Sequence, residues 1–137
     1  MKNLKNYNIK NKKILFRADL NIPVVDGLIT DTSRIQAIKS SIEILISNKN
    51  KIFLMAHFGR PKGKIVDKYS LNFILPSLKE TLNLDKVFFL DNFDHVSVEK
   101  KFNEMQDGNL CLIENIRFLK EEENIDLNFA KKISSLF

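Results

Sequence analysis

The chain has 137 residues, 44% of them hydrophobic and 28% charged, and its formal net charge is +5. These values are typical of one soluble globular domain, and no apolar run approaches the ~20 residues that a membrane span needs. The single cysteine excludes an internal disulfide, and the basic start of the chain lacks the apolar segment of a secretory signal. We therefore expect a cytoplasmic protein without a membrane partner.

Four short apolar runs are typical of strands that are covered on both faces. They lie at residues 13–18, 52–55, 87–90 and 110–113. Cys111 lies inside the last run, which predicts a small buried hydrophobic residue rather than a reactive thiol.

Amphipathic patterns between these runs predict helices. Oxygen-bearing side chains at residues 30–32 offer an N-cap to a helix that continues to about residue 48, and Ser70 offers a cap to a second helix. Pro76 either kinks this second helix or marks its true start, and the sequence leaves both open. Other expected features are a turn at Asp26-Gly27, a helix around 98–105, a turn at Asp107-Gly108, an acidic loop at 121–123 and a helix from about Asp126.

Strands that alternate with amphipathic helices predict βαβ units. The expected fold class is α/β, a three-layer αβα arrangement with a parallel, Rossmann-like sheet. In such a sheet all strands end at one carboxyl edge, where open α/β folds bind ligands.

The first strand leads into a polar row. In extended chain Arg17, Asp19 and Asn21 share one face, while Phe16, Ala18 and Leu20 share the other. Pro23 cannot donate to a sheet, so we expect pairing to fail there. This row suits a small, oxygen-rich anion, although a solvated strand end with a simple Arg–Asp pair explains these residues equally well.

Arginine is scarce, since only four of the 22 basic residues are arginines. Arg17 closes the first strand, Arg34 opens the first helix, Arg60 follows the second strand and Arg117 follows the fourth. All four positions belong to the carboxyl edge of a parallel sheet, and guanidinium groups bind phosphate through two parallel hydrogen bonds. The pattern favours a bound polyanion, and specifically a phosphorylated one.

Other groups near this edge are less specific. His57 and Gly59 fall on the same rim, whereas His95 is expected at the surface and Glu114 is expected to pair with a neighbouring base. The run 59–65 is one residue short of a P-loop and has Ile65 in place of the Ser or Thr that would hold magnesium. No zinc spacing or Ser-His-Asp set is evident, so no metal ligands are predicted.

Five blocks in order resemble the amino-terminal domain of phosphoglycerate kinase and together span nearly the whole chain. They are residues 17–23 (RADLNIP), 26–35 (DGLITDTSRI), 54–63 (LMAHFGRPKG), 70–71 (SL) and 114–118 (ENIRF) followed by acidic residues. Ile22, Ala56 and Phe58 depart from the usual family residues in ways that suggest packing changes.

The resemblance implies reversible phosphoryl transfer between 1,3-bisphosphoglycerate with ADP and 3-phosphoglycerate with ATP. Asp19 and Asn21 would contact the hydroxyl and carboxyl end of the glycerate, and Arg34 would stabilise the transferring group. The basic patch around the substrate would comprise Arg17, His57, Arg60 and Arg117, with Gly59 on its rim. Such chemistry relies on positioning and electrostatics more than on covalent catalysis.

The resemblance also implies that residues 1–137 are a partial amino-terminal domain that binds 3-phosphoglycerate. An apolar helix face runs to Phe137 without a cap, which suggests a truncated chain. Mg-ATP or Mg-ADP would bind a carboxy-terminal domain that is absent, so we expect the fragment alone to be inactive, and the protein to be a monomer.

Two other functions fit parts of the sequence. A nucleic-acid or polyanion module would use the net charge and the lysines at 10, 12 and 13, but no aromatic residues are interleaved with them. A receiver or flavodoxin-like domain would need an acidic cluster at the end of the first strand, where Asp19 stands alone beside an arginine. We therefore expect no nucleic-acid partner.

Overall fold

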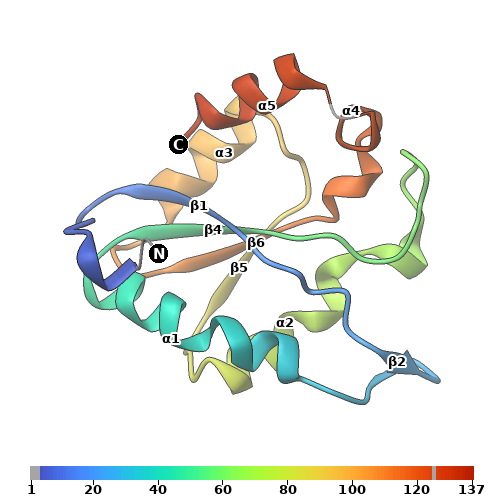
Figure 1. Ribbon diagram of the computed structural model, residues 1–137, viewed down its shortest axis with the longest axis horizontal. Helices are drawn as coiled ribbons and strands as arrows, with labels where there is room; N and C mark the ends of the chain where they lie inside the picture. Colours follow the sequence, from blue (N-terminus) through green and yellow to red (C-terminus); the bar gives the residue numbers. More distant parts are fainter. Residues whose placement is uncertain (1–3, 125) are drawn as a thin grey trace.

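The chain folds around a parallel sheet of four strands, as the computed structural model shows for residues 4–124 and 126–137 (Figure 1). The strands are β1 (Lys13–Arg17), β4 (Lys51–Met55), β5 (Val87–Leu90) and β6 (Leu110–Ile113). Their order across the sheet is β1-β4-β6-β5, and every neighbouring pair is parallel. The predicted α/β class with a parallel, Rossmann-like sheet is confirmed.

Helices cover both faces of the sheet, which gives the three predicted layers (Figure 1). Helices α1 (Ser33–Ser47) and α2 (Leu75–Thr81) lie on one face, and α3 (His95–Glu104) and α5 (Leu127–Ser134) on the other. Shorter helical segments are η1 (Leu4–Asn6), η2 (Asp67–Tyr69), η3 (Leu71–Ile74), η4 (Ile116–Phe118) and α4 (Lys120–Glu123). Within the described ranges, no helix has the length and apolarity to cross a membrane.

The core follows from strict alternation along the strands. Side chains of one parity, such as Leu54 and Leu112, pack under α1 and α2, while Phe53 and Cys111 pack under α3 and α5. Because Leu54 pairs with Leu112 and Phe53 with Cys111, each core layer forms continuous rows across the sheet. Cys111 is fully buried as predicted, and this burial raises the pKa of its thiol to about 12.

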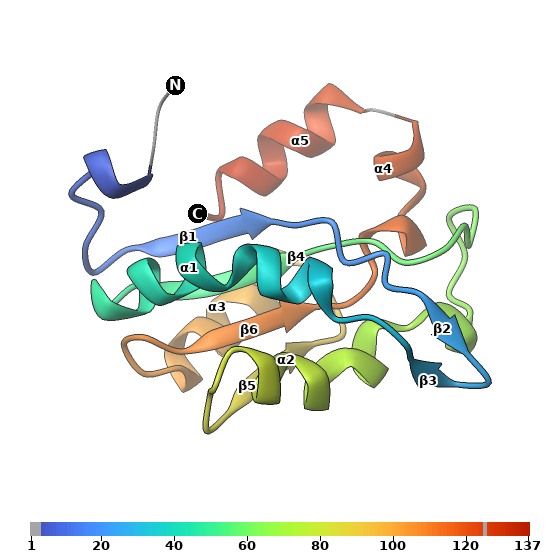
Figure 2. The same cartoon turned by 60° about the horizontal axis from the view of Figure 1, so that its bottom comes forward.

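The connections between the parallel strands can all be right-handed because the helices change from one face of the sheet to the other. From β1 to β4 to β5 the chain moves in one direction across the sheet, with α1 and α2 on the same face. It then returns to β6, between β4 and β5, through α3 on the opposite face. A reversal of direction together with a change of face preserves the right-handed crossover. All strands therefore end at one edge of the sheet (Figure 2).

Three local features differ from the sequence-based expectations. Sheet pairing of the first strand ends at Arg17, with one further bond from Ala18 N to Met55 O (3.0 Å), well before Pro23. The predicted turn at Asp26-Gly27 is confirmed, but it joins an unexpected hairpin of β2 (Val24–Val25) and β3 (Leu28–Ile29). Asp26 and Gly27 both adopt positive φ (51° and 77°), as primed hairpin turns require. The expected acidic loop at 121–123 lies entirely within the short helix α4.

The alternatives for Pro76 are resolved in favour of a helix start. Pro76 lies in the first turn of α2, where its missing N–H has no intrahelical partner to lose. The segment from Leu71 to Ile74 is a separate 3-10 turn, and the Ser70 side chain caps it by accepting from Asn72 N (3.2 Å).

Asn50 generates a prediction about stability. Its fully buried side chain donates to Ile9 O (3.0 Å) and Leu45 O (2.9 Å) and accepts from Lys12 N (3.0 Å). Asn50→Ala should lower the free energy of unfolding by about 3 kcal/mol, roughly 1 kcal/mol for each lost bond. Asn103→Ala, at an exposed position of α3, should change it by less than about 0.5 kcal/mol. Urea unfolding measures both values. Equal decreases in the free energy of unfolding for the two variants would show that the three hydrogen bonds of Asn50 do not stabilise the fold.

Candidate functional site

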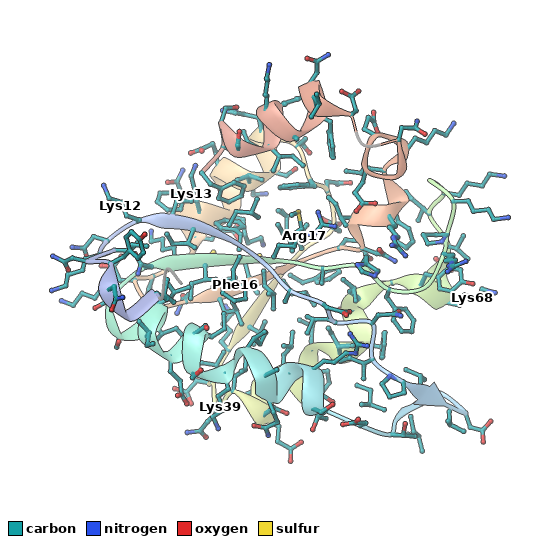
Figure 3. All side chains as sticks on the ribbon, in the orientation of Figure 1. Lys12, Lys13, Phe16, Arg17, Lys39 and Lys68 are labelled. Atoms are coloured by element: carbon teal, nitrogen blue, oxygen red, sulfur yellow. The ribbon has the colours of Figure 1, made fainter. Side chains whose placement is uncertain are left out.

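The candidate site lies at the carboxyl edge of the sheet. In Figure 2 the strands point toward the end of the molecule where the β2–β3 hairpin, α4 and the loop after β4 gather. Arg17 lies at this end of β1, whereas Lys12 and Lys13 lie at the other (Figure 3). This edge collects the polar groups that follow each strand.

The tail of β1 keeps its alternation after sheet pairing has stopped. Ala18 and Leu20 are buried under α1, whereas Arg17, Asp19 and Asn21 are exposed, which confirms the two predicted faces. Asp19 forms an ion pair with Arg34 from the first turn of α1, and its Oδ1 also accepts from Asn21 N (3.0 Å). The tail and the start of α1 are thus joined at the site.

Gly59 links the tail of β1 to the segment after β6. Its N–H donates to Asn21 Oδ1 (3.0 Å), and its carbonyl accepts from Arg117 Nη1 (3.0 Å). Gly59 adopts a positive φ of 62°, and a Cβ there would lie 2.4 Å from the Tyr69 ring. Glycine is therefore required both by the backbone and by the close approach of Tyr69.

Two arginines share one carboxylate. Arg17 Nη2 lies 3.0 Å from Glu122 Oε1, and Arg117 Nε lies 3.9 Å from Glu122 Oε2. The structure thus brings Arg17, Arg34 and Arg117 to one edge together with Asp19, Asn21 and Gly59. Arg60 is exposed next to Gly59, and its side chain forms no ion pair or hydrogen bond with the described residues.

His57 lies within the electrostatic field of these groups. Partial burial lowers the pKa of His57 below its ordinary value of 6.5. The positive charges of Arg117, Arg17 and Arg34 lower it further, and only the carboxylate of Glu122 acts in the opposite sense. His57 is therefore mainly neutral at pH 7.

Two positioning groups were not predicted from the sequence. Asn115, 2% exposed, accepts from Phe58 N (3.3 Å) and Arg117 N (3.1 Å) and donates to Phe58 O (2.7 Å) and Tyr69 O (2.9 Å). Glu122 was expected only as part of an acidic loop. The signal for Asn115 in the sequence was an amide residue two positions after a predicted buried strand, but no local pattern marks Glu122.

The expectation that Glu114 pairs with a neighbouring base is wrong. Its carboxylate accepts from Ser70 Oγ (2.6 Å), Leu71 N (2.8 Å) and Asn115 N (2.7 Å). It serves as an acceptor for the chain turn that leads into η3, whose free N–H groups need partners. His95 is exposed at the start of α3, as predicted.

The edge gathers groups whose chemistry is compatible with an oxygen-rich anion. Guanidinium groups, an imidazole that can be protonated and backbone N–H groups supply donors, while Asp19 and Asn21 supply acceptors for a hydroxyl group. The fold and this edge define a class, an α/β protein with arginine side chains gathered at the carboxyl ends of parallel strands.

The comparisons with known proteins identify the family. The family model for phosphoglycerate kinase matches residues 4–137. The chain is 42% identical over 137 residues to "Phosphoglycerate kinase" from Finegoldia magna, covering 98% of the chain and 34% of the relative. It is 43% identical over 130 residues to "Phosphoglycerate kinase 1, chloroplastic" from Arabidopsis thaliana, covering 94% of the chain and 27% of the relative.

Solved structures agree with this match. The crystal structure of phosphoglycerate kinase from Pyrococcus horikoshii OT3 superposes with a TM-score of 0.83 at 28% identity, covering all of this chain and 35% of that one. The structure of phosphoglycerate kinase from Coxiella burnetii superposes with a TM-score of 0.80 at 29% identity, covering 96% of this chain and 32% of that one. The chain belongs to the phosphoglycerate kinase family, as its sequence blocks predicted. It spans about a third of the length of the curated relatives it matches.

The environment of His57 predicts a response to anions. His57 should titrate below 6.5 in the free chain, and inorganic phosphate should raise its pKa because the anion favours the imidazolium form. Long-range proton–nitrogen NMR of the imidazole measures both values. As pH falls below 6.5, His57 takes up a proton more readily in the unfolded chain than in the folded one, because its pKa is lower in the folded chain. The free energy of unfolding should therefore decrease over this pH range. If phosphate left the pKa of His57 unchanged, the assignment of His57 to an anion site would be wrong.

The close approach at Gly59 gives a matched pair of variants. Gly27 also has a positive φ (77°) but open space around a Cβ, so Gly27→Ala should lose only about 1 kcal/mol of stability. Gly59→Ala adds a clash with Tyr69 and should lose about 2–4 kcal/mol. Thermal unfolding of both variants measures the difference. Indistinguishable losses would show that Tyr69 moves away without a penalty.

Proposed function

We propose that residues 1–137 form the partial amino-terminal, 3-phosphoglycerate-binding domain of a phosphoglycerate kinase. The whole enzyme would transfer a phosphoryl group reversibly between 1,3-bisphosphoglycerate with ADP and 3-phosphoglycerate with ATP. The observation that carries this proposal is the convergence of Arg17, Arg34 and Arg117 at one sheet edge within the field felt by His57.

In this proposal, two sets of side chains would bind opposite ends of the substrate. Arg17, Arg117 and His57 lie together and would hold the phosphate that is not transferred, with Arg60 reaching in from the exposed loop. Asp19 and Asn21 would contact the hydroxyl and carboxyl end. Asp19 is paired with Arg34, so the same ion pair would direct Arg34 toward the transferring group.

The role proposed for Arg34 is electrostatic. Phosphoryl transfer spreads negative charge over the equatorial oxygens, and a fixed guanidinium stabilises that charge without covalent chemistry. Arg34 suits this role because it lies in the first turn of α1, where the free N–H groups of a helix start add to the positive potential.

We infer that Mg-ATP and Mg-ADP bind a second, carboxy-terminal domain and that these 137 residues alone do not turn over substrate. This inference is supported by the share of each relative that the chain covers, about a third. We also propose that the whole enzyme is a cytoplasmic monomer whose partners are its small-molecule substrates.

Binding by the 137-residue chain tests the site. Calorimetric titration with 3-phosphoglycerate should give weak, salt-sensitive binding, because charged contacts at an open surface are screened. Arg34→Ala and Arg60→Ala should each weaken it about tenfold, equivalent to ~1.4 kcal/mol. Lys79→Ala, an exposed cation on α2, serves as the control and should bind as the parent does. Parent-like binding by both arginine variants would overturn the assignment.

A further inference from the structure

Glu122 contacts the guanidinium groups of both Arg17 and Arg117, and it does so from their more buried side. Its side chain is 15% exposed, against 59% for Arg17 and 31% for Arg117. The most buried member of the group is therefore the carboxylate. The arginines keep exposed donor groups on the solvent side, where an anion would arrive.

The two arginines come from separate parts of the sheet. Arg17 ends β1 and Arg117 follows β6, and β4 lies between these strands. Arg117 has a second anchor in the carbonyl of Gly59 (3.0 Å), but among the described residues the Arg17 guanidinium is held by Glu122 alone. A long, exposed arginine without such a partner samples many rotamers, and binding would have to restrict them.

We propose that Glu122 is a positioning residue that fixes Arg17 beside Arg117, so that both guanidiniums meet the same phosphate group. This rests on the proposed function, since it assumes that these arginines bind the substrate. Glu122 does not contact the substrate itself. It orders the arginines before the substrate binds, and its charge offsets the repulsion between them.

Positioning and simple charge predict opposite effects, which makes the proposal testable. If Glu122 only contributed negative charge, removing that charge would strengthen the binding of any anion. If it positions the arginines, removing it should weaken binding despite the added positive potential. Glu122 is also the group that raises the pKa of His57, which provides a readout in the absence of ligand.

The experiment compares Glu122→Gln with Glu121→Gln in the 137-residue chain. Glu121 is an exposed neighbour on the same helix and forms no ion pair with the described residues, so it controls for net charge. The dissociation constants for 3-phosphoglycerate and for inorganic phosphate, and the pKa of His57, are measured by NMR. Glu122→Gln should weaken 3-phosphoglycerate binding about five- to tenfold and lower the pKa of His57, and Glu121→Gln should do neither.

The outcomes separate this inference from the proposed function. Unchanged or tighter binding by Glu122→Gln would overturn the positioning role. If the parent binds inorganic phosphate but not 3-phosphoglycerate, the proposed function fails, and Glu122 is judged on phosphate binding by the same criterion. Should Glu122→Gln not give the dispersed spectrum of a folded chain, Glu122→Asp decides. Glu122→Asp keeps the charge but shortens the side chain by one methylene, which draws the carboxylate back from the two arginines, so parent-like binding by this variant also refutes positioning.

Discussion

The carboxyl edge depends on the hydrogen bonds of one buried amide, that of Asn115. Where β4 and β6 end, partly buried backbone groups lose their sheet partners, and leaving such groups unsatisfied is costly. Asn115 satisfies both backbone groups of Phe58, the N–H of Arg117 and the carbonyl of Tyr69. The residues on either side of these contacts are His57, Gly59 and the Arg117 side chain. The hydrogen bonds of Asn115 thus stabilise the backbone and, in doing so, position His57, Gly59 and Arg117 at this edge.

Electrostatics at this edge represent a balance between attraction for a ligand and repulsion within the site. Three guanidiniums at one end of a small sheet repel one another, and two carboxylates, Asp19 and Glu122, offset part of that repulsion. The imidazole of His57 stays mainly neutral at pH 7 in the same field, which avoids a further positive charge beside Arg17, Arg34 and Arg117. Three guanidiniums against two carboxylates leave this group of residues with a net positive charge.

Local patterns were sufficient for the strands, the main helices and the two faces of the β1 tail, because alternation and helical spacing are properties of neighbouring residues. They also located the arginines, since the direction of a parallel sheet determines which loops share an edge. The partners of those residues were not accessible in the same way. Arg17 and Glu122 are 105 residues apart, and the pairing of Glu114 with Ser70 depends on how two crossovers pack. The hairpin was missed because two-residue strands carry no readable alternation.

The place of β6 in the sheet has a consequence for how the chain is made. β6 is the last of the four strands in sequence, yet it lies between β4 and β5. During synthesis from the amino terminus, β5 has no neighbour and β4 has one open side until residue 113 has left the ribosome. Exposed strand edges of this kind attract other chains. A translational pause before that point would therefore leave the nascent protein open to misassembly or to capture by chaperones.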